Sequence, residues 1–105
     1  MISNEKIDQA VSIIVKHASP EKIILFGSYA NGNPEKDSDI DLFIVESKLK
    51  NKYKETVRLR RALSPLRIPV DIIVHSNKSL KNWGHIPGTL MYTILKEGKT
   101  LYEKT

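Results

Sequence analysis

Residues 26–45 read FGSYANGNPEKDSDIDLFIV, and this stretch is the most informative part of the chain for its fold. Gly27-Ser28 comes directly after an apolar run, and Asp39-Ile40-Asp41 opens a second apolar run beyond a polar loop. Ten residues separate the glycine-serine pair from the first aspartate. Short apolar runs bounded by turn residues are typical of buried strands. The stretch therefore predicts two strands that present polar groups where the chain turns between them.

The first half of this stretch suits the binding of a phosphate group. Residues 23–26 predict a short buried strand that ends at a glycine. Gly27 allows a sharp turn and a close approach to a ligand. Residues 28–31 suit a short helix whose first amides would point toward an anion, and the Ser28 hydroxyl would add a donor. A glycine-serine pair without further context is commonly only a turn.

The second half suits a divalent cation. Residues 40–45 predict the next strand, and side chains alternate between the faces of a strand, so Asp39 and Asp41 share a face, two rises of roughly 3.3 Å apart. Two such carboxylates can converge on one or two hard cations, and magnesium is commonly held by carboxylates together with substrate phosphates. An Asp-x-Asp pair alone is commonly exposed to solvent or serves as a helix cap. The combination with Gly27-Ser28 is what indicates a site.

A third carboxylate lies within the next predicted strand, residues 68–74. Asp71 is the only charged residue of this apolar run. Burial of an acid is costly unless it is paired, hydrogen-bonded or close to a metal. If this strand lies beside the strand of Asp39 and Asp41, three carboxylates face one pocket. A neighbouring arginine such as Arg67 is the structural alternative as the partner of Asp71.

This combination of motifs resembles the DNA polymerase beta-like nucleotidyltransferase superfamily. The residues that carry the resemblance are Gly27-Ser28, Asp39-x-Asp41 and Asp71. The small size of the chain is similar to that of the minimal nucleotidyltransferases, the MNT family, and the resemblance extends from the leading helix to residues 98–103. We therefore expect an α/β nucleotidyltransferase fold, with a small mixed sheet of three to four strands packed against about four helices.

The resemblance also implies an activity and a site. It implies magnesium-dependent transfer of AMP from ATP to a hydroxyl, often that of a tyrosine, on a partner protein. Gly27 and Ser28 would bind the triphosphate, Asp39 and Asp41 would hold two magnesium ions, and Asp71 would complete the metal site and serve as general base. Many family members are antitoxins encoded beside an all-helical HEPN toxin, so a HEPN-type toxin is the expected partner.

One departure from the family pattern keeps a second hypothesis open. Members often read Gly-Ser-x-Ala-Arg-Gly, whereas Asn31 stands at the arginine position here. The alternative function is a catalytically weak or inactive binding module that neutralises a toxin by complex formation. Modification of a small molecule such as an aminoglycoside, and RNA binding by the basic residues between 48 and 67, are further alternatives. Homo- and hetero-oligomers both stay open.

Composition places these motifs in an ordinary globular context. The chain has 105 residues, of which 40% are hydrophobic and 28% are charged, so we expect a single domain, 1–105. It shows no apolar run long enough to cross a membrane and no cysteine, which favours a cytoplasmic protein. The net charge of +5 suits a polyanionic partner, and the scarcity of aromatic residues in the basic region disfavours nucleic acid.

The remaining elements follow from apolar spacing and capping residues. We expect a first helix capped by Ser3 and running to about residue 18, a helix over 52–63, and a last helix that begins near Pro87 or Thr89. That last helix would bury Leu90, Met91, Ile94 and Leu95 and end at Gly98, ahead of an edge strand over 100–103. Between these helices, residues 76–84 predict a polar segment anchored by Trp83.

Overall fold

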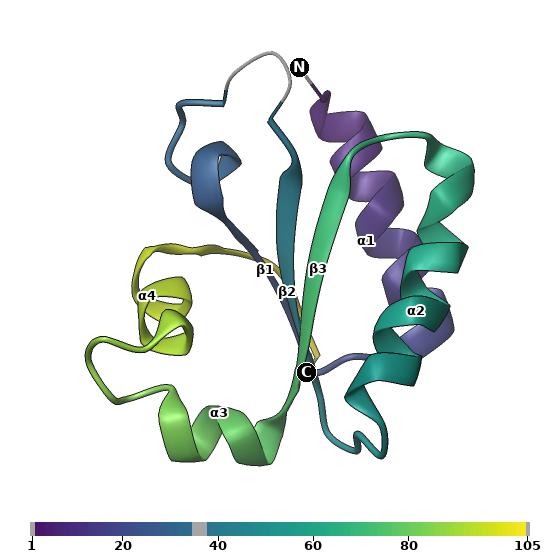
Figure 1. The fold of residues 1–105 in the computed structure, drawn as a ribbon. Coiled ribbons are helices and arrows are strands. Elements are labelled where there is room, and N and C mark those ends of the chain that lie inside the picture. Colours follow the sequence, from purple (N-terminus) through teal and green to yellow (C-terminus); the bar gives the residue numbers. More distant parts are fainter. Residues whose placement is uncertain (1, 35–37, 105) are drawn as a thin grey trace.

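The computed structural model describes residues 2–34 and 38–104, and Figure 1 shows its central four-stranded sheet with helices on both sides. The polar loop of the opening stretch includes residues 35–37, which lie outside the described residues. In chain order the elements are α1 (Asn4–Ala18), β1 (Lys22–Phe26), the 3-10 turn η1 (Gly27–Tyr29), β2 (Ile40–Glu46), α2 (Lys52–Leu63), the 3-10 turn η2 (Ser64–Leu66), β3 (Val70–Ser76), α3 (Asn77–Trp83), α4 (Leu90–Glu97) and β4 (Lys99–Glu103). The expected α/β fold is confirmed.

The sheet is mixed and has the strand order β3-β2-β1-β4. Strand β2 pairs antiparallel with β1 and parallel with β3, and the edge strand β4 pairs antiparallel with β1. The parallel pair requires a crossover, which α2 supplies. In this register Phe26, Asp41 and Asp71 form one row across β1, β2 and β3.

The two faces of the sheet have different coverings. Helices α1 and α2 cover one face, whereas α3 and α4 lie against the other (Figure 1). Leu42 and Ile44 belong to the larger core on the α1–α2 side, and Phe43 and Val45 belong to a smaller core with α4. Because side chains alternate along a strand, Asp41 lies on the same face as Phe43, the side of α3 and α4.

Side-chain caps explain where the three longer helices begin. The Ser3 hydroxyl accepts a hydrogen bond from the amide of Lys6 at 3.2 Å. The Asn51 side chain caps α2, and the Thr89 hydroxyl caps α4 by accepting from the amide of Tyr92 at 3.1 Å. Such caps satisfy amides that lack partners within the first turn. The predicted starts near Ser3, residue 52 and Thr89 are thus confirmed.

The prediction for the segment around Trp83 is wrong. Residues 76–84 contain helix α3, which Ser76 caps by accepting from the amide of Ser79 at 3.1 Å. Trp83 is 55% exposed and does not anchor the segment. It ends a helix of only seven residues and lies at the surface. The sequence pattern missed this helix because few apolar residues mark a buried face.

The last helix also differs from its predicted packing. Met91 and Ile94 are buried, whereas Leu90 and Leu95 are exposed, Leu90 by 58%. Residues three apart on a helix share a face, and in an eight-residue helix only this pair reaches the sheet. Gly98 follows the helix as predicted, although its backbone is extended.

Two boundaries are shifted as well. Strand β3 begins at Val70 and continues to Ser76, two residues beyond the predicted start and end. The short helix expected over 28–31 is a 3-10 turn, η1, that begins at Gly27. Across the parts of the chain that the structure describes, no helix has both the length and the apolar character needed to cross a bilayer.

Candidate active site at the ends of β1, β2 and β3

The strand register brings two of the predicted carboxylates together. Asp41 and Asp71 are direct neighbours in the parallel pair of β2 and β3. Residues at the same level of adjacent strands are about 4.8 Å apart, so the two side chains flank one point at the strand ends. Asp39 lies just before β2 and is exposed.

Gly27 lies on the other side of Asp41, at the end of β1. Its φ of +75° is a backbone conformation that side-chain-bearing residues rarely adopt. A Cβ atom built on Gly27 would lie 2.3 Å from Oδ2 of Asp41. Glycine is therefore required here for two reasons, the turn and the approach of the Asp41 carboxylate. Asp41 thus lies between the Gly27-Ser28 turn and Asp71.

The three aspartates influence one another electrostatically. Partial burial raises the pKa of Asp41 above its ordinary value, and the negative charges of Asp71 and Asp39 raise this pKa further. Like charges that crowd one carboxyl group favour its protonated form. A cation placed among them would reverse this effect.

Asp71 has a partner that the sequence did not identify. Nη2 of Arg60, on α2, lies 3.0 Å from Oδ1 of Asp71, and both side chains are exposed. The expected alternative partner, Arg67, instead ends η2 in a left-handed conformation with φ of 52°. The two residues are eleven positions apart in the chain, and the packing of α2 beside β3 brings them together.

The residues at this site fit a magnesium ion by their chemistry. Magnesium is commonly bound by one or two carboxylates, with waters and substrate phosphates completing its shell. Asp41 and Asp71 supply such a pair, and the pKa of Asp41 is raised first by burial and then by the charges of Asp71 and Asp39. Within the described residues, however, no three histidine or acidic side chains are gathered closely enough to hold a metal ion alone.

A first cavity, of about 250 Å³, lies beside Gly27 between η1 and α4. Asn31 lines it, together with Thr93 and Glu97. The residue that departs from the family pattern is therefore next to the Gly27 turn. The complete lining is Phe26, Gly27, Asn31, Leu90, Thr93, Ile94, Glu97 and Gly98.

A second cavity, of about 300 Å³, lies on the same sheet face below Asp41 and Asp71. Its walls are mainly apolar, and one side is formed by His75, whose ring centroid is 5.6 Å from that of Phe43. Burial and then the charge of Lys52 lower the pKa of His75, which favours the neutral imidazole. The lining comprises Phe43, Ile73, His75, Trp83, Thr89, Leu90, Met91 and Ile94.

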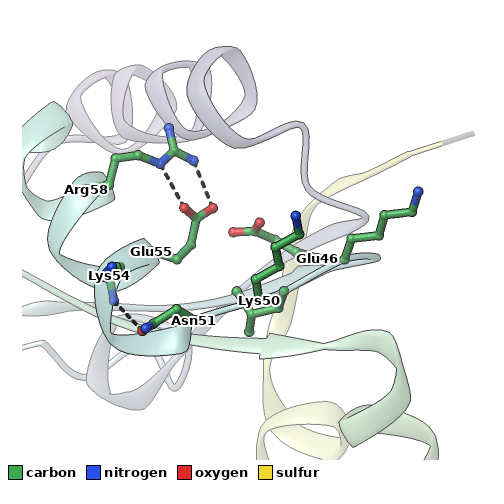
Figure 2. Close-up of a pocket in the computed structure, with 8 residues that line it drawn as sticks. Glu46, Lys50, Asn51, Lys54, Glu55 and Arg58 are labelled. Carbon is green, nitrogen blue, oxygen red and sulfur yellow. Dashed lines mark hydrogen bonds and ion pairs between the residues drawn. The ribbon is translucent and has the colours of Figure 1, made fainter.

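A third pocket lies at the other end of β2 and has a different character. Figure 2 shows the carboxyl groups of Glu46 and Glu55 turned toward each other, with Arg58 bound to Glu55 through two nitrogen atoms. Glu46 is only 6% exposed, and its Oε2 has no hydrogen-bond partner among the described residues. Burial raises the pKa of Glu46 to about 8, and the hydrogen bond to Glu55 and its charge act in the same direction.

This third pocket is separate from the aspartate site. Glu46 pairs with Ser76 in the same register in which Asp41 pairs with Asp71, five residues earlier along each strand. The two residue pairs are therefore five rises of roughly 3.3 Å apart along the strands. Because side chains alternate along β2, Glu46 points to the opposite sheet face from Asp41, toward α1 and α2. We therefore regard the Glu46–Glu55–Arg58 cluster as part of the packing of α2.

Sequence reasoning found the aspartates and Gly27 but missed Arg60 and most of the residues that line the two cavities. Period-two alternation places Phe43 on the same face as Asp41, and Ile73 on the same face as Asp71. These two lining residues of the second cavity could therefore have been predicted from the sequence. Arg60, Trp83 and Glu97 belong to helices whose position against the sheet the pattern does not specify. Their roles required the tertiary structure.

The chain resembles known proteins in both sequence and structure. The family model described as "Polymerase beta, Nucleotidyltransferase" matches residues 8–105. A crystal structure from Sulfolobus solfataricus, described as a candidate nucleotidyltransferase, has a TM-score of 0.67 at 20% identity and covers 95% of this chain and 79% of its own. No curated protein sequence matches the chain.

Two further solved structures come from toxin–antitoxin pairs. A variant of the MntA–HpeT toxin–antitoxin has a TM-score of 0.67 at 19% identity, covering 93% of this chain and 73% of that one. A toxin–antitoxin with AMP-PNP has a TM-score of 0.62 at 22% identity, covering 99% and 76%. At these identities the likeness establishes a shared fold.

Proposed function

The chain belongs to the Polymerase beta nucleotidyltransferase family, and from this premise we propose that it uses magnesium to transfer AMP from ATP to a hydroxyl of a partner protein. The observation that carries the proposal is the row across the sheet. Asp41 lies between Asp71 on one side and the Gly27 turn on the other. Carboxylates beside a glycine-serine turn form the arrangement that phosphoryl chemistry with a divalent cation requires.

Each predicted site residue has a role in this proposal. Gly27 and Ser28 bind the triphosphate, because the turn leaves the backbone open to close approach. Asp39 and Asp41 hold magnesium, with Asp71 as a further ligand. The bound metal would neutralise charge on the attacking and leaving oxygens. The cavity beside Gly27 is the position for the nucleoside, since it adjoins the triphosphate turn.

Asp71 has a second role as proton acceptor. A general base must lie within hydrogen-bond reach of the hydroxyl proton that it removes. Asp71 is exposed and lies at the edge of the site that is farthest from Gly27, so an incoming hydroxyl can reach it. Nη2 of Arg60 lies 3.0 Å from Oδ1 of Asp71, which orients the carboxylate until the acceptor arrives.

The partner that we propose is a HEPN-type toxin, with a tyrosine as the acceptor, in the cytoplasm. Support comes from the solved structures that share the fold, because the two named above are toxin–antitoxin assemblies and one of these contains AMP-PNP, an ATP analogue. The family membership and the aspartate row support the chemistry; the neighbours support the kind of partner.

The test is transfer of label from ATP labelled at the α-phosphate, in the presence of magnesium. The acceptor is the protein that co-purifies with the full chain, and the Asp39→Ala, Asp41→Ala double variant is the control. Label on the partner with the wild-type protein but not with the control supports the proposal. Equal labelling by the control would remove both carboxylates from the mechanism.

A second function, toxin neutralisation by binding alone, is favoured by one observation. Asn31 lines the cavity beside Gly27 and supplies an amide where family members often have a cationic arginine. Loss of a positive charge beside a triphosphate weakens its binding. Neutralisation that needs an equimolar amount of this protein and survives the double substitution would establish the binding module.

A further inference from the structure

The strand order sets the direction from which an acceptor can approach. Across the site the order is β3, β2, β1, with Asp71 on β3, Asp41 on β2 and the Gly27-Ser28 turn after β1. Displacement at phosphorus is in line, so the attacking and leaving oxygens lie on opposite sides of the phosphorus atom. A triphosphate bound at Gly27 and Ser28 places the leaving pyrophosphate on the β1 side. The acceptor hydroxyl must then come from the β3 side.

The surface on the β3 side is apolar. Phe43 and Ile73 follow Asp41 and Asp71 by two residues on their strands, a separation of two rises of roughly 3.3 Å. Both residues line the cavity of about 300 Å³. Met91, on α4, also lines this cavity. Trp83 lines the cavity as well and remains 55% exposed.

We propose that this cavity receives an apolar side chain of the acceptor protein, adjacent in that protein to the residue that becomes modified. The inference rests on the proposed function and specifies its substrate class. A side chain seated against Phe43, Ile73 and Trp83 would hold the neighbouring hydroxyl within reach of Asp71. Binding energy from a non-reacting group would thereby orient the reacting one.

The chemistry of the walls selects a protein over the other acceptor classes. The walls are mainly apolar, so the hydroxyls of a cationic sugar would lose hydrogen bonds to water there and regain few from His75 and Thr89. Helix α3, which supplies Trp83 to the wall, carries exposed Lys78 and Lys81 and no acidic residue. A polycationic aminoglycoside is therefore disfavoured twice. A segment with an apolar residue and acidic neighbours fits both features.

The test separates acceptor recognition from chemistry by steady-state labelling with labelled ATP, magnesium and the co-purifying partner at varied concentrations. Trp83→Ala should raise the KM for the partner by about tenfold or more, because an exposed tryptophan at a pocket is typical of binding hot spots. The KM for ATP and the kcat should change less than about twofold. Trp83→Phe should restore most of the acceptor affinity.

Tyr53→Ala is the matched control, since Tyr53 is 78% exposed on α2, away from the cavity. It should leave all three parameters unchanged. Circular dichroism and AMP-PNP binding establish that each variant is folded. An unchanged partner KM in Trp83→Ala, or kanamycin labelled with a higher kcat/KM than the partner, would overturn the inference while the proposed chemistry stands. Absence of transfer by the wild-type protein would refute the proposed function and the inference with it.

Discussion

Replacement of Glu46 by glutamine should make the protein more stable at alkaline pH. The folded protein raises the pKa of this carboxyl from 4.5 to about 8, chiefly through burial. The folded state therefore binds the proton more tightly than the unfolded state does. The stabilisation from this group is complete below about pH 4.5 and is lost as the pH rises toward 8. A glutamine is neutral throughout, and its amide can still donate to the Glu55 carboxylate.

The size of the effect follows from the separation of the two pKa values. At about 1.4 kcal/mol per pH unit, the full separation corresponds to about 5 kcal/mol. Lysines 48, 50 and 54 line the same pocket as Glu46. Their positive charges, together with water that enters the pocket, would offset part of the free-energy cost of ionising the Glu46 carboxyl group. We therefore expect Glu46→Gln to exceed the wild type by about 2 kcal/mol in the free energy of unfolding near pH 9 and to match it near pH 5.

The assay is urea unfolding followed by circular dichroism at several pH values. Other groups titrate in the same window, above all His75, whose lowered pKa makes the fold more stable as the pH rises. Subtraction of the wild-type and variant curves at each pH removes this contribution, because His75 lies on the opposite sheet face from Glu46.

Glu97→Gln, at an exposed position on α4, serves as the control and should follow the wild-type curve. Parallel curves for the wild type and Glu46→Gln between about pH 5 and about pH 9 would refute the reasoning. The neutral state of Glu46 would then contribute nothing to the stability of the α2 packing.

Three further predictions concern the aspartate site. Asp41→Asn should abolish label transfer without lowering the urea midpoint, because it removes repulsion by Asp71 and Asp39; normal transfer would exclude Asp41 from the chemistry. Gly27→Ala should lose transfer and about 1–2 kcal/mol of stability, since its Cβ would lie 2.3 Å from Asp41 Oδ2. Gly32→Ala shares the positive φ but contacts nothing within 4 Å, so it should lose stability while keeping transfer. Arg60→Gln should change stability by less than about 1 kcal/mol and lower the magnesium concentration that gives half-maximal transfer, because it releases Asp71; a higher requirement would show that Arg60 contributes to substrate binding.

The aspartate row and most elements around it could be predicted from the sequence. Alternation along two apolar runs placed Asp41 and Asp71 on strand faces, and the glycine-serine pair marked the turn where a ligand can approach. The caps at Ser3 and Thr89 act within four residues, so their helices could be predicted from local patterns. Local hydrogen bonds and period-two alternation depend only on residues that are close together in the chain. Both can therefore be predicted from the sequence without knowledge of the tertiary structure.

The side chains that surround the aspartate row could be identified only from the tertiary structure. Trp83 and Leu90 were expected to be buried, yet they remain exposed beside a cavity, because α3 and α4 are too short to turn more than one pair of side chains toward the sheet. Arg60 rather than Arg67 meets Asp71, because the position of α2 against β3 depends on packing across the whole core. The raised pKa of Glu46 likewise depends on its burial beneath α2. No local sequence pattern predicts which residues of α2 lie against Glu46.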